Sequence, residues 1–264
     1  MKNLRRYGEE PFIVAVIHGG PGAPGGMAPV ARELSKYCGV LEPLQTADTI
    51  EGQVQELEAI IKEYGSSPLV LIGHSWGAWL GYMFSAKYPS LVKKLVLVGS
   101  GPYEEKYVSM MNETRTKRLT EKEKARIKDL TGLMNDPQVL DKKGLFEEFG
   151  KIMSGVDSFR PIQNHKEAVE FQPEIFHRIM KEAIELRRSG ELKEIGKNIS
   201  CPVVAIHGDY DGHPAQGVEL PLSEVIGDFR FILLKDCGHN PWNEYFVKDE
   251  FYEVLKAEIM KDIW

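Results

Sequence analysis

The sequence predicts an α/β fold with a mostly parallel sheet of about six strands and a helical insertion. Short apolar runs of strand length alternate with segments of helical periodicity, which is typical of a parallel sheet with helices on both faces. The alternation stops after Pro102 and resumes after Asn198, and the charged stretch between them carries helical patterns without a convincing strand. We therefore expect a core domain of residues 1–101 and 199–264, with residues 102–198 inserted into it.

The elements are expected in the following order. The polar residues 1–10 predict a short lead-in with no strand. Strands are expected at residues 12–17, 39–44, 69–72, 95–98, 202–206 and 229–234. Helices are expected at residues 27–37, 49–64, 78–86, 121–134, 174–188 and 242–263. The charge runs at 115–129 and 181–194 are expected to be solvated helix faces.

Composition excludes several classes of function. The net charge of −6 over 264 residues argues against a nucleic-acid surface. No segment is apolar over the length that spans a membrane, and the run 12–17 is too short for the core of a signal peptide. The three cysteines, Cys38, Cys201 and Cys237, form no CxxC pair, so we expect neither a disulfide framework nor a zinc site. A reducing cytoplasm fits this usage best.

The stretch 69–78 gives the strongest functional signal. The expected strand 69–72 runs into Gly73-His74-Ser75-Trp76-Gly77, which matches G-x-S-x-G, and a helical pattern follows. In this strand–turn–helix context the serine is a nucleophile exposed at a sharp turn beside a helix N-terminus. The alternative is an ordinary turn with an incidental serine, but the context favours Ser75 as nucleophile.

A serine nucleophile needs a base, and the base needs an acid that orients it. His239 follows the expected strand 229–234, and Asp211 follows the expected strand 202–206, so both belong to the edge of the sheet where Ser75 lies. The chain order Ser75, Asp211, His239 is that of a hydrolase triad. Asp209 is the alternative acid, expected to brace the loop instead, and Asp236 is too close to His239 in the chain.

The other histidines have ordinary explanations. His18, His74 and His207 lie at strand ends and are expected to form hydrogen bonds within their loops. His165 and His177 are expected at the surface or in packing, and His213 does not follow the last strand.

The negative charge that develops on the substrate needs an oxyanion hole. The amide of Trp76, directly after the nucleophile, is one expected donor. The other is expected from the loop His18-Gly19-Gly20-Pro21-Gly22, where we choose Gly20 with Gly19 as the alternative. This loop lacks the Lys-Ser/Thr of a P-loop and the spacing of a dinucleotide-binding loop.

These motifs, together with Gly208-Asp209-Tyr210-Asp211 and Gly238-His239-Asn240-Pro241-Trp242, resemble the α/β-hydrolase superfamily. The HGGPG loop and the Ser-Trp-Gly turn are most similar to its proline iminopeptidase branch. The resemblance implies a serine hydrolase without metal or cofactor, in which residues 102–198 form a helical cap that selects the substrate. The superfamily's two leading strands are expected to be missing here, since about eleven residues precede the first central strand.

The resemblance leaves the substrate open. Iminopeptidases bind the free amino end of their substrate with cap carboxylates, but no motif matches Glu104, Glu105 or Glu113 to that role. Candidate pocket residues that are as easily core residues are Trp79, Tyr103, Tyr107, Phe146, Phe149 and Trp242. We expect hydrolysis of an ester or amide bond in a small molecule or short peptide, including a peptide with N-terminal proline. The alternatives are a carboxylesterase, a C–C bond hydrolase or a non-catalytic binding protein. The oligomeric state is not predicted.

Overall fold

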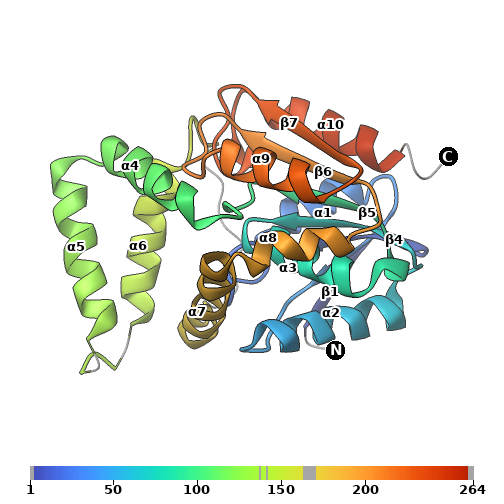
Figure 1. The fold of residues 1–264 in the computed structure, drawn as a ribbon, viewed down its shortest axis with the longest axis horizontal. Helices are drawn as coiled ribbons and strands as arrows, with labels where there is room; N and C mark the ends of the chain where they lie inside the picture. Colours follow the sequence, from blue (N-terminus) through green and yellow to red (C-terminus); the bar gives the residue numbers. More distant parts are fainter. Residues whose placement is uncertain (1–2, 137, 141, 163–170, 261–264) are drawn as a thin grey trace.

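The computed structural model describes residues 3–136, 138–140, 142–162 and 171–260. Its centre is one sheet (Figure 1). The strand order in this sheet is β1-β3-β2-β4-β5-β6-β7. The strands are β1 (Leu4–Tyr7), β2 (Phe12–Ile17), β3 (Gly39–Pro43), β4 (Leu69–His74), β5 (Val92–Val98), β6 (Val203–Gly208) and β7 (Phe229–Leu234). All six expected strands are present, and β2 to β7 are parallel to one another. The predicted fold class is therefore confirmed.

A seventh strand, β1, lies within the residues expected to be a lead-in. It pairs antiparallel with β3 at the edge of the sheet, from Leu4 opposite Pro43 to Tyr7 opposite Val40. Its sequence, Leu-Arg-Arg-Tyr, has no apolar run, because an edge strand is only half buried. The Tyr7 hydroxyl donates a hydrogen bond of 2.7 Å to the buried Glu42 carboxylate on β3. This polar pairing is why periodicity alone misses the strand.

The strand register aligns the carboxyl ends of the central strands. Ile17 of β2 lies opposite Gly73 of β4, and His74 lies opposite Val98 of β5. Farther along the sheet, Gly208 of β6 lies opposite Leu234 of β7. The loops that follow β2, β4, β5, β6 and β7 therefore emerge at one edge, where an open parallel sheet forms its crevice.

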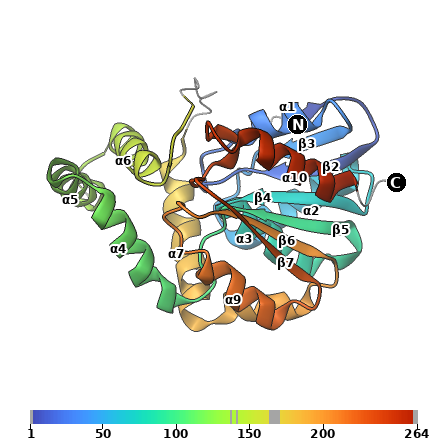
Figure 2. The same cartoon turned by 90° about the horizontal axis from the view of Figure 1, so that it is seen from above.

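Helices cover both faces of the sheet (Figures 1 and 2). One face buries an apolar cluster with α2 (Ile50–Tyr64), α3 (Trp76–Lys87) and α9 (Gln216–Val225). The other face buries a second cluster with α1 (Ala28–Leu34) and α10 (Lys248–Met260). Short 3-10 turns occur at Pro89–Leu91 and Pro241–Asn243. Trp242 thus lies in a separate turn before α10, and the last residues of the helix expected at 242–263 lie outside the described part.

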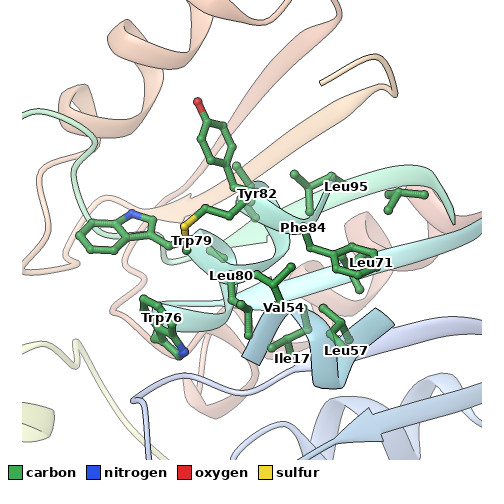
Figure 3. Close-up of a cluster of buried hydrophobic side chains, with 14 of the residues drawn as sticks. Ile17, Val54, Leu57, Leu71, Trp76, Trp79, Leu80, Tyr82, Phe84 and Leu95 are labelled. Carbon is green, nitrogen blue, oxygen red and sulfur yellow. The ribbon is translucent and has the colours of Figure 1, made fainter. Parts of the chain in front are cut away.

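Helix α3 is the most deeply buried of these helices. Every residue from Trp76 to Ser85 is buried, which is typical of a helix surrounded by protein on all sides. Figure 3 shows part of the apolar cluster around this helix. The labelled residues are Trp76, Trp79, Leu80, Tyr82 and Phe84 of α3, Val54 and Leu57 of α2, and Ile17, Leu71 and Leu95 of the sheet. The turn that precedes α3 is therefore held by a rigid, closely packed element.

The described residues between β5 and β6 are mostly helical, and those of 102–198 contain no strand. Its α-helices are α4 (Val108–Arg118), α5 (Glu121–Asn135), α6 (Lys143–Val156), α7 (Pro173–Ser189) and α8 (Glu191–Glu194), with 3-10 turns at Glu105–Tyr107 and Ile195–Asn198. Both views show α5 and α6 side by side and far from the sheet, whereas α7 lies against the core (Figures 1 and 2). Ile175, Ile179 and Ala183 of α7 belong to the first apolar cluster. None of the described helices has the length and apolarity needed to cross a membrane.

Candidate active site

Ser75 lies at the turn between β4 and α3, in a backbone conformation that few residues adopt. Its φ is 53° and its ψ is −114°, and its amide donates a 3.0 Å hydrogen bond to the carbonyl of Val98. A positive φ at a residue other than glycine costs free energy, and such residues are frequent at functional sites. A Cβ at Gly73 would collide with the carbonyl of Gly77, and one at Gly77 with the carbonyl of Ile17. The two glycines of the motif therefore permit the turn.

The turn places Ser75 at the N-terminal end of α3, where it is the N-cap residue. The first amides of a helix have no partner within the helix, so they can stabilise an anion beside Ser75. On the other side lies the loop after β2, and a Cβ at Gly19 would stand only 3.0 Å from the Cβ of Ser75. Gly20 has a φ of 66°, a value that favours glycine.

His239 and Asp211 form a hydrogen-bonded pair at the same edge of the sheet. Nδ1 of His239 donates to Oδ2 of Asp211 over 2.8 Å, and the Asp211 side chain is fully buried. Burial alone would lower the pKa of His239, but the charge of Asp211 and the hydrogen bond it accepts outweigh burial and raise that pKa. Burial likewise opposes ionisation of Asp211, but the charge of His239 and the hydrogen bond from His213 help to hold its pKa well below the ordinary value. Asp211 is thus the ionised partner of a basic histidine.

A second histidine, His213, occupies the other oxygen of Asp211. Its backbone amide and its Nδ1 each lie 2.9 Å from Oδ1 of Asp211. Its Nε2 lies 3.2 Å from Nη2 of Arg115, which can only donate, so Nε2 accepts and Nδ1 carries the proton. Burial is the main cause that lowers the pKa of His213 to about 4. His213 is therefore a neutral donor that fixes the orientation of the Asp211 carboxylate.

Arg115 connects helix α4 to this network. It donates two hydrogen bonds to the Asp157 carboxylate, of 2.9 Å from Nε to Oδ1 and 2.5 Å from Nη2 to Oδ2. The carbonyl of Asp157 in turn accepts the backbone amide of His239 over 2.8 Å. The loop of His239 is held further by Glu244, whose carboxylate accepts the amides of Gly238, Phe159 and Arg160. The segment 157–160 thus bonds directly to the loop that carries His239.

These residues open onto one cavity of about 310 Å³. Four of the five candidate residues line it, namely Gly20, Ser75, Trp76 and His239, and Asp211 lies behind His239. The rest of the wall is mostly apolar: Pro21, Trp79, Gly101, Pro102, Met111, Arg115, Phe149, Met153, Phe176, Met180, Arg187 and His213. An apolar cavity with a few convergent polar groups is the usual form of a small-molecule site.

The family model described as the alpha/beta hydrolase fold matches residues 42–142 of this chain. The sheet order, the turn at Ser75 and solved structures that superpose over nearly the whole chain agree with it. The chain has the α/β-hydrolase fold.

Known proteins with the α/β-hydrolase fold that resemble this chain differ in activity. The proline iminopeptidase of Saccharolobus solfataricus is 26% identical, over 93% of this chain and 84% of its own length. The solved proline iminopeptidase of Mycobacterium smegmatis superposes with a TM-score of 0.66 at 16% identity, covering 98% of this chain and 94% of the other. An esterase from Exiguobacterium antarcticum superposes with a TM-score of 0.67 at 17% identity, covering 97% and 94%. The structural likenesses establish the fold alone.

Within this α/β-hydrolase fold, the remaining histidines take local roles. Nε2 of His74 lies 3.0 Å from the carbonyl of His239, and Nε2 of His207 lies 2.9 Å from the carbonyl of His213. Nδ1 of His18 lies 3.1 Å from the carbonyl of Gly19. His177 is exposed, whereas His165 lies outside the described residues. Asp209 accepts the amide of Cys237 at 3.3 Å, and this contact braces the loop.

One cluster of the described residues could be considered for a metal. Single donor atoms of Asp211, His213 and His239 lie within 4.8 Å of one another. The two oxygens of Asp211 already accept N–H groups from the two rings, and the free side of His213 faces the cation of Arg115. These contacts are those of a hydrogen-bond network, and a metal ion would have to displace them.

The candidate pocket residues named from the sequence fall into two groups, those that line the cavity and those that pack against other side chains. Trp79 and Phe149 line the cavity. Tyr103, Tyr107 and Trp242 are buried in packing, and Phe146 packs against Phe171 and Phe176. None of the acidic candidates lies on the cavity wall: Glu104 pairs with Lys106, Glu105 with Arg187, and Glu113 with Lys117.

Two arginines of the wall were missed by sequence reasoning. Arg115 and Arg187 fall within the charge runs that were expected to be solvated faces. The side chain of Arg115 is 17% exposed and that of Arg187 is 9% exposed, and both line the cavity. The expectation is wrong at these two positions, because each arginine turns inward to an acidic partner. No sequence pattern distinguishes them from their exposed neighbours.

Proposed function

We propose that this chain is a serine hydrolase that cleaves an ester or amide bond of a small substrate through an acyl-enzyme. The observation that carries the proposal is that Ser75, in its strained turn, lines one cavity with His239, which is paired with the buried Asp211. These are the nucleophile, base and orienting acid that acyl transfer requires.

In the proposed mechanism, Ser75 attacks the carbonyl carbon of the substrate while Nε2 of His239 takes the hydroxyl proton. The Nδ1–H···Asp211 hydrogen bond keeps the proton on Nδ1 and so leaves Nε2 free to act as the base. The backbone amides of Trp76 and Gly20 donate hydrogen bonds to the oxyanion, with Gly19 as the alternative to Gly20. His239 then protonates the leaving group, and a water molecule that it activates hydrolyses the acyl-enzyme.

We also propose that residues 102–198 act as the cap that selects the substrate, since they supply Met111, Phe149, Met153, Phe176 and Met180 to the cavity wall. Of the two activities that the relatives suggest, the esterase is favoured here. A peptidase that binds a free amino end needs an acidic side chain near the scissile bond, and no described residue of the cavity wall is acidic. We place the enzyme in the cytoplasm on account of its three free cysteines.

The test of the proposal is Ser75→Ala, measured with a p-nitrophenyl ester and with a fluorophosphonate probe that labels activated serines. We expect Ser75→Ala to abolish turnover and labelling while the unfolding transition stays cooperative. Ser100→Ala is the matched control, because Ser100 is a buried serine after the neighbouring strand and is not part of the cavity wall. Unchanged turnover in Ser75→Ala would refute the proposal. A wild-type enzyme that hydrolyses the ester but is not labelled at Ser75 would indicate a different reaction mechanism.

A further inference from the structure

The cavity wall beside Ser75 carries positively charged side chains, whose carboxylate partners do not themselves line the cavity. Among the described residues that line it, the charged side chains are Arg115 and Arg187, and none is a carboxylate. The remaining wall is apolar except for Ser75 and the two histidines. A cation at the wall of an apolar cavity lacks the hydration it would have in water, so it attracts an anion strongly.

The two arginines differ in how far their own partners neutralise them. Arg115 binds the buried Asp157 through two hydrogen bonds, and its Nη2 also faces His213. Arg187 makes one hydrogen bond, from Nε to Oε2 of Glu105 over 2.8 Å. The Glu105 side chain is 41% exposed and also lies 3.6 Å from Arg188, so water and a second cation weaken its hold on Arg187.

The outer part of the Arg187 guanidinium is available to a ligand. Within the described part of the chain, the structure gives neither of its Nη atoms a hydrogen-bond partner, although its side chain is about nine-tenths buried. Its Cζ lies 5.8 Å from the ring centre of Trp79, whose Nε1 is itself fixed by the carbonyl of Gly101. Packing of Ile179 and Ala183 into the core holds the helix that carries Arg187. The guanidinium is therefore largely buried and preorganised, while the Arg187 side chain still lines the cavity.

The position of Arg187 relates it to the reacting serine. Trp79 stands four residues after Ser75 on α3, about 6 Å along the helix, and Arg187 lies over its ring. A ligand group on Arg187 would thus lie in the same cavity as the bond that Ser75 attacks, but at a separate point. A planar guanidinium with two free nitrogens matches a carboxylate, which it can bind with two hydrogen bonds.

We infer that the substrate carries a carboxylate, remote from the scissile bond, that Arg187 binds while the apolar wall holds the chain between them. This inference rests on the proposed function and names the substrate class of that site. It predicts an enzyme that prefers half-esters of dicarboxylic acids, or esters of a carboxylate-bearing alcohol, over neutral esters of equal length.

The test compares ester pairs that differ only in the remote carboxylate. One series carries it on the acyl side: the p-nitrophenyl half-esters of glutaric, adipic and suberic acids against p-nitrophenyl esters of pentanoic, hexanoic and octanoic acids. The other carries it on the alcohol side: 4-carboxyphenyl against phenyl esters. In at least one of the two series we expect kcat/KM to be about tenfold higher for the carboxylate ester than for its neutral counterpart, which corresponds to the free energy of one charge-assisted hydrogen bond. Arg187→Gln is expected to remove this preference by raising KM for the carboxylate esters.

Two neighbouring variants separate substrate binding from a merely structural ion pair. Arg188→Gln is the matched control, because Arg188 also faces Glu105 but does not line the cavity. Glu105→Gln breaks the ion pair and leaves Arg187 charged, so we expect it to keep or increase the preference for carboxylates. If Glu105→Gln and Arg187→Gln lose the preference equally, or if the wild type has none in either series, the inference is wrong.

A binding measurement keeps this inference separate from the proposed mechanism. Ser75→Ala is titrated calorimetrically with the same carboxylate and neutral esters, with and without Arg187→Gln. Tighter binding of the carboxylate ester that depends on Arg187 supports the inference even if the wild type hydrolyses no ester. Equal binding of both esters refutes it even if Ser75 proves to be the nucleophile.

Discussion

Replacing Asp211 by asparagine tests the proposed site most directly, because the structure predicts how the new amide would orient. In the wild type, Oδ1 accepts two N–H groups of His213, each at 2.9 Å, whereas Oδ2 accepts the single N–H of His239 at 2.8 Å. An amide has only one oxygen. It satisfies more donors by keeping that oxygen toward His213 and turning its NH₂ group toward His239.

This orientation would reverse the tautomer of His239. A donor NH₂ opposite Nδ1 forces that nitrogen to accept, so the proton moves to Nε2, where the base is needed. We expect kcat/KM to fall by roughly 10³–10⁴-fold, the loss that follows when a triad histidine has the wrong tautomer. Loss of the charge-assisted hydrogen bonds is also expected to lower the free energy of unfolding by about 1–3 kcal/mol.

The pH dependence supplies a second readout for the same variant. The proposed reaction needs neutral His239, so in the wild type we expect the acidic limb of kcat/KM to follow the raised pKa of His239, above its ordinary value of about 6.5. Asp211→Asn removes the charge that raises this pKa, so the limb of the residual activity should move to lower pH. Asp211 itself has a depressed pKa, so the stability that its charge gives is present above about 3.9 and is lost as the pH falls through the folded-state value.

The assay is initial-rate hydrolysis of p-nitrophenyl butyrate across the pH range, together with urea unfolding. Asp209→Asn is the control, because it changes the same loop and affects a single 3.3 Å contact with the amide of Cys237. A folded Asp211→Asn enzyme that keeps more than about a tenth of the wild-type kcat/KM would refute the tautomer argument and the assignment of Asp211 as the acid.

Two further predictions concern the residues that hold His239. The charge of Arg115 lowers the pKa of His239, whereas the charge of Asp157 raises it, so Arg115→Gln should move the acidic limb of kcat/KM to higher pH. Arg118→Gln on the same helix is the control, and an acidic limb that does not differ between the two variants would contradict this prediction. Glu244→Gln leaves one side-chain oxygen for three backbone N–H groups, so we expect the free energy of unfolding, measured by urea titration, to fall by about 1–3 kcal/mol. Glu250→Gln, at an exposed glutamate, is the control, and an equally small effect of both variants would contradict this prediction.

The core strands and the positions of the candidate triad could be predicted from the sequence because they depend on local patterns. Strands buried on both faces are continuous apolar runs, as in 69–72 and 203–206, and each ends at a glycine turn or a polar loop. Since parallel strands share one carboxyl edge, the residues after each strand must lie near one another. This reasoning brought Asp211 and His239 to adjacent loops, where the structure joins them at 2.8 Å.

Other features could not be predicted, because they depend on contacts between distant segments. The edge strand β1 is recognisable only through its pairing with β3. His213 lies beside Asp211 through a turn of two residues, and its role depends on Arg115, which lies 98 residues earlier in the chain. The turn inward of Arg187 depends on Glu105 and Trp79, to which no periodicity connects it. An amphipathic helix shows which face is apolar but not which charged residues at the border point into a cavity.

The charge of the cavity limits what can be transferred from the relatives. A substrate with a free amino end carries a positive charge there, and like charges repel each other. Arg187 would oppose such a substrate, whereas the charge of Arg115 is balanced by the buried Asp157, and no described residue of the wall is a carboxylate. Arg187 favours an anion instead, since neither of its Nη atoms has a hydrogen-bond partner among the described residues. The turn at Ser75 is compatible with either reaction, so under the proposed function we expect helix α7, which carries Arg187, to decide between them.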